Sequence, residues 1–173
     1  FLQQPTQNTG LDEILEVSKT YYGNLKDTAR TLIKFDTTPL SQSIVSGEVT
    51  MSSAELILHE CESSEIPTDY TIYAYPVSQS WDVGIGTRFD DISTDGVSWK
   101  KRTTSNNWLG NGFATGTTGS FNGKGGTWYT GSAASQSFSY ESTDIDMNVL
   151  TPLTSWVSGS IPNEGWIIKH SSA

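Results

Sequence analysis

The strongest constraint on the fold is a two-residue alternation of apolar and polar side chains that recurs along the chain. Segments with this pattern are short, rich in β-branched and aromatic residues, and separated by Gly, Pro, Ser and Asp. Because successive side chains of a strand point to opposite faces, such segments are typical of half-buried antiparallel strands. We therefore expect at least six strands, within 13–17, 30–35, 54–59, 70–75, 135–141 and 166–170.

Two of these segments, 32–33 and 56–58, are apolar on both faces. One face would line a core, and the other would be covered by a loop or by a partner. The pattern predicts an all-β fold, an antiparallel β-sandwich of jelly-roll or Greek-key type. A length of 173 residues suits one domain, so we expect 1–173 to form a single β-sandwich.

One short helix is expected near 151–158. Thr151 is the predicted cap, Pro152 suits the first helical position, and Gly159 suits the exit. A helix of about two turns is not stable alone, so we expect Trp156 to fasten it to the core. The apolar side chains that would share one face are Val149, Leu153, Trp156 and Val157.

The segment 106–135 differs from the rest because it holds eight of the 16 glycines, interleaved with aromatic residues. Loops of this length inside a compact domain are uncommon and are often functional. We expect an ordered excursion that packs on the sandwich or on a partner. The simpler and favoured interpretation is that its aromatic side chains only fasten a long loop to the sheet.

Composition excludes several classes of protein. The chain has 10 Lys and Arg against 19 Asp and Glu, a net charge of −9 that nucleic acids and anionic lipids would repel. One Cys cannot build a disulfide framework or a cysteine zinc site, and two His leave little for catalysis. No apolar run has the roughly 18 residues of a membrane span.

Carbohydrate binding is one functional hypothesis, because sugars stack on aromatic rings while carboxylates and amides bind their hydroxyls. Trp81 and several other aromatic residues are expected in loops or at strand ends, near Asp82 and Asn106. The favoured alternative is that these rings are ordinary core or interface residues. The candidate contacts for a sugar or a protein partner are Trp99, Trp108, Phe113, Phe121, Trp128 and Tyr129.

A calcium loop is a second hypothesis. Asp91, Ser93 and Asp95 place oxygen ligands at alternate positions before Gly96. The run lacks a third alternate ligand and the distal bidentate Glu of a calcium loop. Asp followed by Gly is also an ordinary turn signal, and the turn interpretation is favoured.

Two further residue patterns are weighed for catalysis. Asp144 and Asp146 would share a strand face and resemble a glycosidase carboxylate pair, but a solvated face is the favoured interpretation. Cys61 alternates with Ile57 and His59, which favours a buried structural thiol over a nucleophile. No motif for a serine nucleophile, a zinc protease or a phosphate loop is present.

The order of several segments resembles the DNRLRE-type domains. Residues 29–36 are similar to their Arg-x-Leu-x-Lys-Phe-Asp strand, and residues 53–58 to the Ser-Ala-x-Leu-x-Leu strand that follows. The similarity covers roughly 11–169. The other segments that carry it are 73–77, 80–81, 144–149, Trp156 and 163–168.

The resemblance implies a jelly-roll β-sandwich without a catalytic motif. Members of the family include carbohydrate-binding modules, some of which bind alginate, and non-catalytic segments of large surface proteins. This chain is most similar to copies in virion structural proteins of large tailed phages, especially marine ones. The segments that carry this closer similarity are 75–81, 95–99, 126–129 and 162–165.

Such proteins have one strand before the equivalent of 8–10 and one or two strands after the equivalent of 167–170. The chain also begins at Phe1 rather than Met. We therefore expect a piece of a longer polypeptide whose missing strands come from that polypeptide or from a neighbouring subunit.

The sequence thus predicts a non-enzymatic domain for assembly or surface decoration of a phage virion, exposed on the extracellular particle. Its expected partners are other protein subunits in an oligomeric assembly, with no cofactor unless the calcium hypothesis holds. The alternative is a glycan-binding module on a receptor-binding fibre or a secreted polysaccharide-active enzyme. Neither interpretation involves nucleic acid or a membrane.

Overall fold

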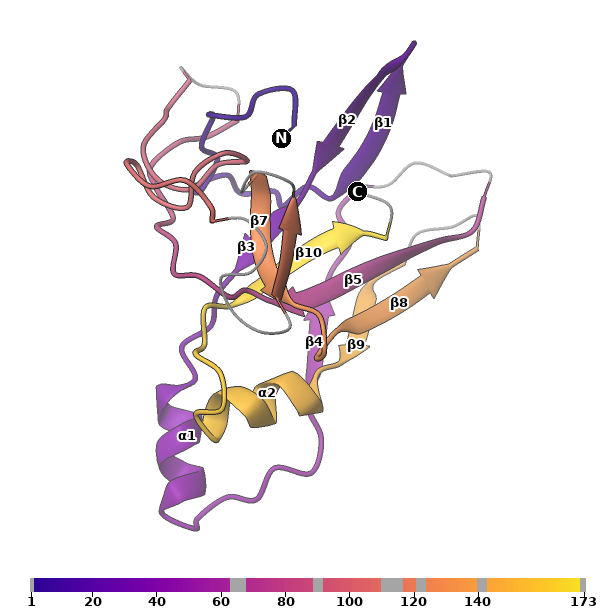
Figure 1. Cartoon of the computed structure of the whole chain (residues 1–173). Coiled ribbons are helices and arrows are strands. Elements are labelled where there is room, and N and C mark those ends of the chain that lie inside the picture. Colours follow the sequence, from indigo (N-terminus) through magenta and orange to yellow (C-terminus); the bar gives the residue numbers. More distant parts are fainter. Residues whose placement is uncertain are drawn as a thin grey trace.

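A computed structural model describes residues 2–62, 68–88, 92–109, 117–120, 124–139 and 143–171. The protein is mostly antiparallel β-sheet with two short helices (Figure 1). This confirms the expected all-β class. The elements are β1 (Ser18–Tyr22), β2 (Leu25–Ala29), β3 (Thr31–Ile33), α1 (Thr38–Val45), β4 (Glu55–Leu58), β5 (Tyr70–Pro76), β6 (Thr117–Ser120), β7 (Lys124–Tyr129), β8 (Ala134–Phe138), β9 (Ile145–Asn148), α2 (Leu150–Val157) and β10 (Trp166–His170).

The centre of the fold is a four-stranded sheet in the order β3-β10-β5-β8. Strand β10 pairs with two neighbours, so that Ile167 lies opposite both Leu32 on β3 and Tyr75 on β5. Alternation along β5 is strict, since its buried and half-buried residues alternate from Tyr70 to Pro76. Strands are confirmed at 30–35, 54–59, 70–75, 135–141 and 166–170. The first two are shorter than expected, β5 extends one residue further to Pro76, β8 begins one residue earlier at Ala134, and β10 has the expected bounds.

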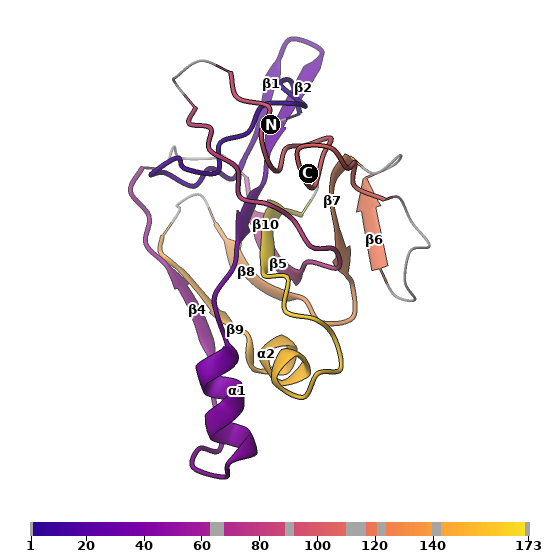
Figure 2. The same cartoon turned by 90° about the vertical axis from the view of Figure 1, so that its left-hand side faces the viewer.

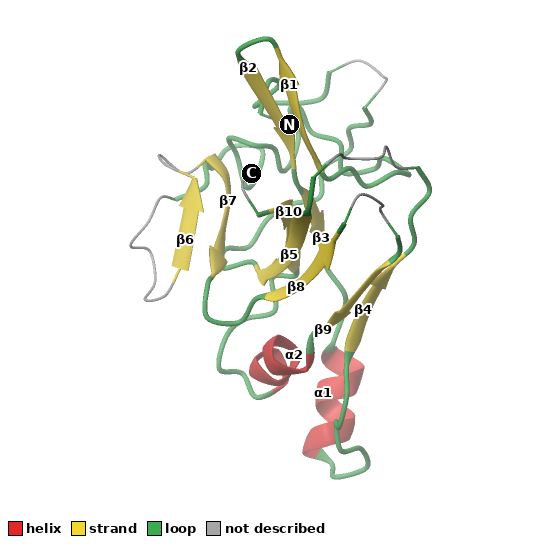
Figure 3. Cartoon of the chain, turned by 90° about the vertical axis from the view of Figure 1, so that its right-hand side faces the viewer, coloured by secondary structure: helices red, strands yellow, loops and turns green. Residues whose placement is uncertain are grey.

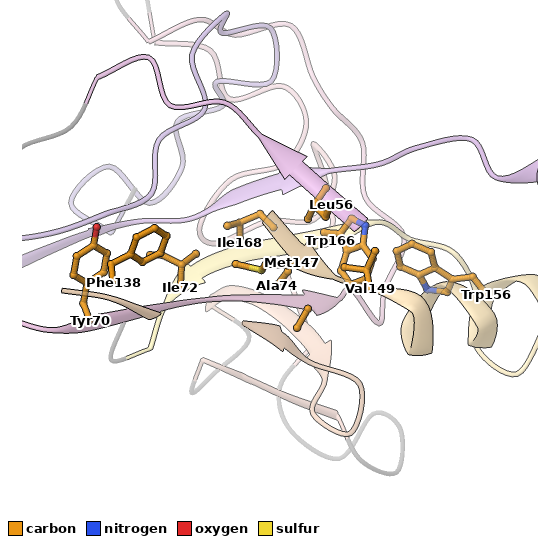
Figure 4. Close-up of a cluster of buried hydrophobic side chains, with 11 residues drawn as sticks. Leu56, Tyr70, Ile72, Ala74, Phe138, Met147, Val149, Trp156, Trp166 and Ile168 are labelled. Atoms are coloured by element: carbon orange, nitrogen blue, oxygen red, sulfur yellow. The ribbon is translucent and has the colours of Figure 1, made fainter. Parts of the chain in front are cut away.

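The main core lies between this sheet and a second layer, the two-stranded sheet β4-β9. Leu56 and Met147 from the second layer pack with Ile72, Ala74 and Ile168 from the central sheet (Figure 4). A smaller cluster of Val77, Trp108, Trp128 and Ile167 covers part of the opposite face of the central sheet. The central sheet is thus covered by apolar side chains on both faces, as the doubly apolar segment 32–33 predicts for β3. The other doubly apolar segment, 56–58, lies in β4 of the second layer, and there Ile57 is 53% exposed, so its outer face is not covered within this chain.

Helix α2 confirms the expected helix and its anchor. Trp156 is buried, and its ring lies 4.5 Å from the ring of Trp166 (centroid to centroid). Gly159 follows the helix with φ +73°, which agrees with its predicted role at the exit. The predicted cap is wrong, because the N-cap is Val149 and the helix already includes Thr151.

Two elements differ from the expectation. Residues 13–17 do not form a strand, and Ile14 and Leu15 are more than half exposed because no neighbouring strand pairs with this segment. The strands β1 and β2 follow it instead as a hairpin. Helix α1 was not expected, since none of its residues is buried and it carries no apolar stripe that a periodicity argument could find.

The hairpin β1-β2 projects from one end of the molecule, and α1 projects from the opposite end (Figures 1 and 2). Part of 106–135 forms a second hairpin, β6-β7, at the side of the central sheet (Figure 3). Its β7 strand docks on the chain after β5, where the Ser78 amide donates a hydrogen bond to the Thr127 carbonyl at 3.1 Å. Among the described helices, none is long and apolar enough to cross a membrane.

Candidate functional site

Three of the predicted contact residues are packed inside the protein. Trp99, Trp108 and Trp128 are only 7, 2 and 7% exposed. The Trp108 indole also donates a hydrogen bond to the Ser98 carbonyl at 3.0 Å. A sugar stacks on an open ring face, which these three indoles do not offer. Their contribution in this structure is to packing, and a contact role for them stays a prediction.

The remaining predicted contacts are placed differently. Tyr129 is half-buried at the end of β7. Phe113 and Phe121 lie outside the described residues. Among the described members of the predicted set, the three tryptophans lie within the protein interior.

The side chain of Arg30 packs against two of these tryptophans, Trp99 and Trp128. The Arg30 guanidinium lies 4.4 Å from the Trp99 ring centroid and 5.3 Å from that of Trp128. It also donates a hydrogen bond to the Gly125 carbonyl. Burial lowers the pKa of Arg30 to about 10. Contacts of this kind stabilise partly desolvated cations, so the indoles and Arg30 form one packed unit.

Asn8 fixes the loops that carry Trp99 and Trp108. Its side-chain amide is fully buried and donates hydrogen bonds to the Val83 and Val97 carbonyls at 2.8 and 2.7 Å. Its side-chain oxygen accepts from the amides of Gly10 and Gly86 at 3.2 and 2.8 Å. All four hydrogen-bonding positions of this amide are thereby used.

The candidate calcium residues form a hydrogen-bonded turn. Ser93 Oγ accepts from the Asp95 amide at 3.3 Å, while the Asp95 carboxylate accepts from the Thr104 hydroxyl. Gly96 has φ +90° and donates its amide to Thr104 Oγ1 at 3.0 Å, which agrees with the turn interpretation. Asp91 lies outside the described residues, and the described part of the chain contains no group of three or more His, Cys, Asp or Glu that could hold a metal.

The acidic residues near β9 are solvated. Asp144 and Asp146 are both exposed, as the favoured interpretation expects. The Asp144 carboxylate accepts from the Glu60 amide at 2.9 Å and contacts His59 Nδ1 at 2.8 Å, and these hydrogen bonds lower its pKa. Cys61 is exposed, so the expected buried thiol is wrong. The reason is that β4 ends at Leu58, so the alternation does not extend to this residue.

The projecting hairpin β1-β2 carries exposed apolar side chains. Tyr21, Tyr22 and Leu25 at its outer end are 62, 71 and 64% exposed. Tyr22 lies directly opposite Leu25, and Tyr21 lies opposite Lys26. A two-stranded hairpin is only marginally stable by itself in water, and grouped exposed apolar side chains mark interaction sites. Sequence reasoning missed this hairpin, although Gly23 and Asn24 between two short β-prone segments are a two-residue turn signal.

A second accessible surface lies on the outer face of β5. The rings of Tyr73 and Tyr75 are stacked, with centroids 5.4 Å apart and planes 12° from parallel. Both residues are half-buried, and burial raises the pKa of Tyr75, with a smaller contribution from Tyr73. The hydroxyls of Thr71 and Ser137 lie 3.0 Å apart on the same face. This surface combines ring faces and hydroxyl groups.

Comparison with models of known protein families gives no match. Comparisons with curated proteins and with solved structures give no match either. The function is therefore argued from the surfaces of this chain itself.

Proposed function

We propose that the chain is a non-enzymatic structural domain that assembles with other protein subunits or decorates a particle surface. The resemblance described above suggests the virion of a large tailed phage as the particle. The observation that carries the proposal is the projecting hairpin β1-β2 with its exposed Tyr21, Tyr22 and Leu25. Burial of these side chains on a partner would stabilise both the contact and the hairpin.

The energetics favour a protein partner for this hairpin. Tyr22 and Leu25 lie opposite each other and share one strand face, whereas Tyr21 points to the other face. Full burial of one large apolar side chain contributes about 1.5–3 kcal/mol, so Tyr22 and Leu25 together provide a useful anchor. Tyrosine is enriched at protein interfaces and at the residues that dominate binding energy. The hairpin also needs no conformational change to present these groups, because it already projects from the body (Figure 1).

The second layer of the fold supports the same proposal. Among the described residues it holds only β4 and β9, opposite a four-stranded sheet. Ile57 on β4 is 53% exposed. A jelly-roll-type sandwich, which remains part of this proposal, would need further strands beside β4-β9. A strand from a neighbouring subunit would supply them and cover the open edge.

The triple substitution Tyr21→Ser, Tyr22→Ser and Leu25→Ser is expected to abolish incorporation into the assembly while leaving the thermal midpoint nearly unchanged. The side chains are exposed, so their loss costs the isolated chain little. The measurement is the amount of full-length wild-type and variant chain in sedimented particles after co-expression with the other particle subunits.

A matched control is Val45→Ser on α1, which removes a side chain that is 84% exposed at the opposite end. It should leave incorporation unchanged. Equal incorporation of the triple variant would remove the hairpin from the proposal. Absence of the wild-type chain from every particle or surface assembly would overturn the assembly function itself.

The second candidate function is glycan binding on the outer face of β5, and the stacked Tyr73 and Tyr75 favour it. If this surface binds sugars, a glycan array with the purified chain should show specific binding that Tyr73→Ala abolishes. Tyr22→Ser on the hairpin should leave that binding intact. No binding to any glycan at millimolar sugar would exclude this function.

A further inference from the structure

Positive charge gathers along one face of the hairpin β1-β2 and at the end of β10, which contacts β1. Four of the ten Lys and Arg residues are here, in a chain whose net charge is −9. Lys19 lies opposite Thr28 in the hairpin, and Lys26 shares the strand face of Thr28 because strand side chains alternate. Arg30 and Lys169 complete the group, and both lie within 6 Å of the Trp128 ring centroid.

Lys169 is the buried member of this group. It is 5% exposed, and its ammonium donates one hydrogen bond, to the His170 carbonyl at 2.9 Å. An ammonium has three donors, and in the described part of the chain no carboxylate pairs with this one. Burial, followed by repulsion from Arg30 and Lys26, lowers the pKa of Lys169 to about 8. Such a buried charge is costly unless an anion compensates it.

A buried hydroxyl accompanies the cations. Thr28 is 1% exposed, and its Oγ1 has no hydrogen-bond partner among the described residues. Most buried hydroxyls in proteins are satisfied by protein or by ordered water, so this hydroxyl is available to bond a group that enters the site. It lies on the strand face of Lys26, directly across the hairpin from Lys19.

We propose that this cationic cluster is a binding site for an oxyanion of the carboxylate or phosphate class, held by Lys169 and Lys26 and by the hydroxyl of Thr28. A cleft of about 1430 Å³ reaches the cluster at Lys19 and Arg30, whereas Lys26, Lys169 and Thr28 do not line it. Hydrogen bonds from ammonium groups to an oxyanion are about twice as strong as neutral ones. The site adjoins the assembly surface, because Lys26 lies opposite Tyr21. Its test is separate, because it measures the binding of small anions rather than incorporation into a particle.

The test is a calorimetric titration of the full chain at neutral pH and constant ionic strength. Sodium phosphate, sodium acetate and a short glutamate peptide serve as separate probes, so that a free ion is distinguished from a carboxylate supplied by a polypeptide. At least one probe should bind the wild-type chain. Lys169→Met should raise its Kd about tenfold or more, and Thr28→Val should raise it about fivefold.

Lys100→Met is the matched control, because Lys100 is exposed and lies outside the cluster. It should leave the Kd unchanged. Lys26→Met provides a second test at a half-buried position, in case Lys169→Met fails to fold. Binding that none of the three cluster variants weakens, or no binding of any probe, would overturn the proposal.

Discussion

Replacing Asn8 by Ala is expected to lower the free energy of unfolding by about 3–5 kcal/mol, because it leaves several buried backbone groups without hydrogen bonds. The Val83 and Val97 carbonyls would lose their donor, and the amides of Gly10 and Gly86 would lose their acceptor. Equilibrium unfolding in urea, followed by tryptophan fluorescence, measures this loss.

The control is Asn107→Ala, since the Asn107 side chain is exposed. Its effect should stay within about 0.5 kcal/mol. Asn8→Asp is expected to lower the free energy of unfolding more than Asn8→Ala does. It replaces the NH₂ group, which donates to two carbonyls, by a carboxylate oxygen that cannot donate, and it introduces a buried charge. A loss below about 1 kcal/mol for Asn8→Ala would show that water or a shifted loop replaces the amide.

The position of Asn8 explains how the loops around Val83 and Val97 acquire a fixed structure. Its amide joins the segment before the hairpin to two loop positions more than 70 residues further along the chain. Those loops carry Trp99 and Trp108 into the interior. No local pattern in the sequence marks Asn8 for this role, because it depends on contacts between distant segments.

Strand positions were predictable where a strand is buried on one or both faces. Strands β5 and β10 have this environment, so their apolar residues recur with a period that can be read locally. The hairpin β1-β2 has no such environment, since it pairs with itself and keeps Tyr21 and Tyr22 exposed. Its sequence therefore lacks the core-facing alternation, and the alternation of 13–17 has no partner strand to stabilise it.

The sequence could indicate which residue types form the candidate site, but it could not indicate how they are arranged in space. The tryptophans could be selected by their chemistry, but the choice between contact and packing depends on Arg30, which is far from Trp99 and Trp128 in sequence. Lys169 joins the same unit from the last strand. Local spacing cannot encode such a cluster, because it forms only when β10 is placed in the centre of the sheet.

Lys169→Met is expected to stabilise the protein at pH 7 by about 1–3 kcal/mol and to remove a rise of stability between pH 8 and about 10. The pKa of Lys169 is lowered to about 8 from its ordinary value of 10.5, mainly by burial. Below pH 8 the Lys169 ammonium is protonated in both the native and the unfolded state. The buried charge then destabilises the native state.

Between the native-state pKa of about 8 and the ordinary pKa of 10.5, Lys169 loses its proton in the native state but keeps it in the unfolded state. The unfolded state then binds more protons, so the free energy of unfolding of the wild-type chain must increase with pH. Methionine has no charge to bury and keeps the contact with Trp128, so the variant should show no such increase. Lys100→Met, at an exposed position, should retain the wild-type dependence.

Urea unfolding at pH 7, 8, 9 and about 9.5 measures the difference between wild type and variant. The series stops there because the lowered pKa of Arg30, about 10, adds a second titration of the same sign. A parallel pH dependence of wild type and variant would show that Lys169 is not charged and buried as the structure places it. In saturating phosphate the wild-type rise should shrink, because a bound anion favours the protonated ammonium and raises the pKa of Lys169. The same rise in phosphate as in chloride, or in acetate where acetate is the probe that binds, would argue against the oxyanion site and leave the buried lysine as a feature of stability alone.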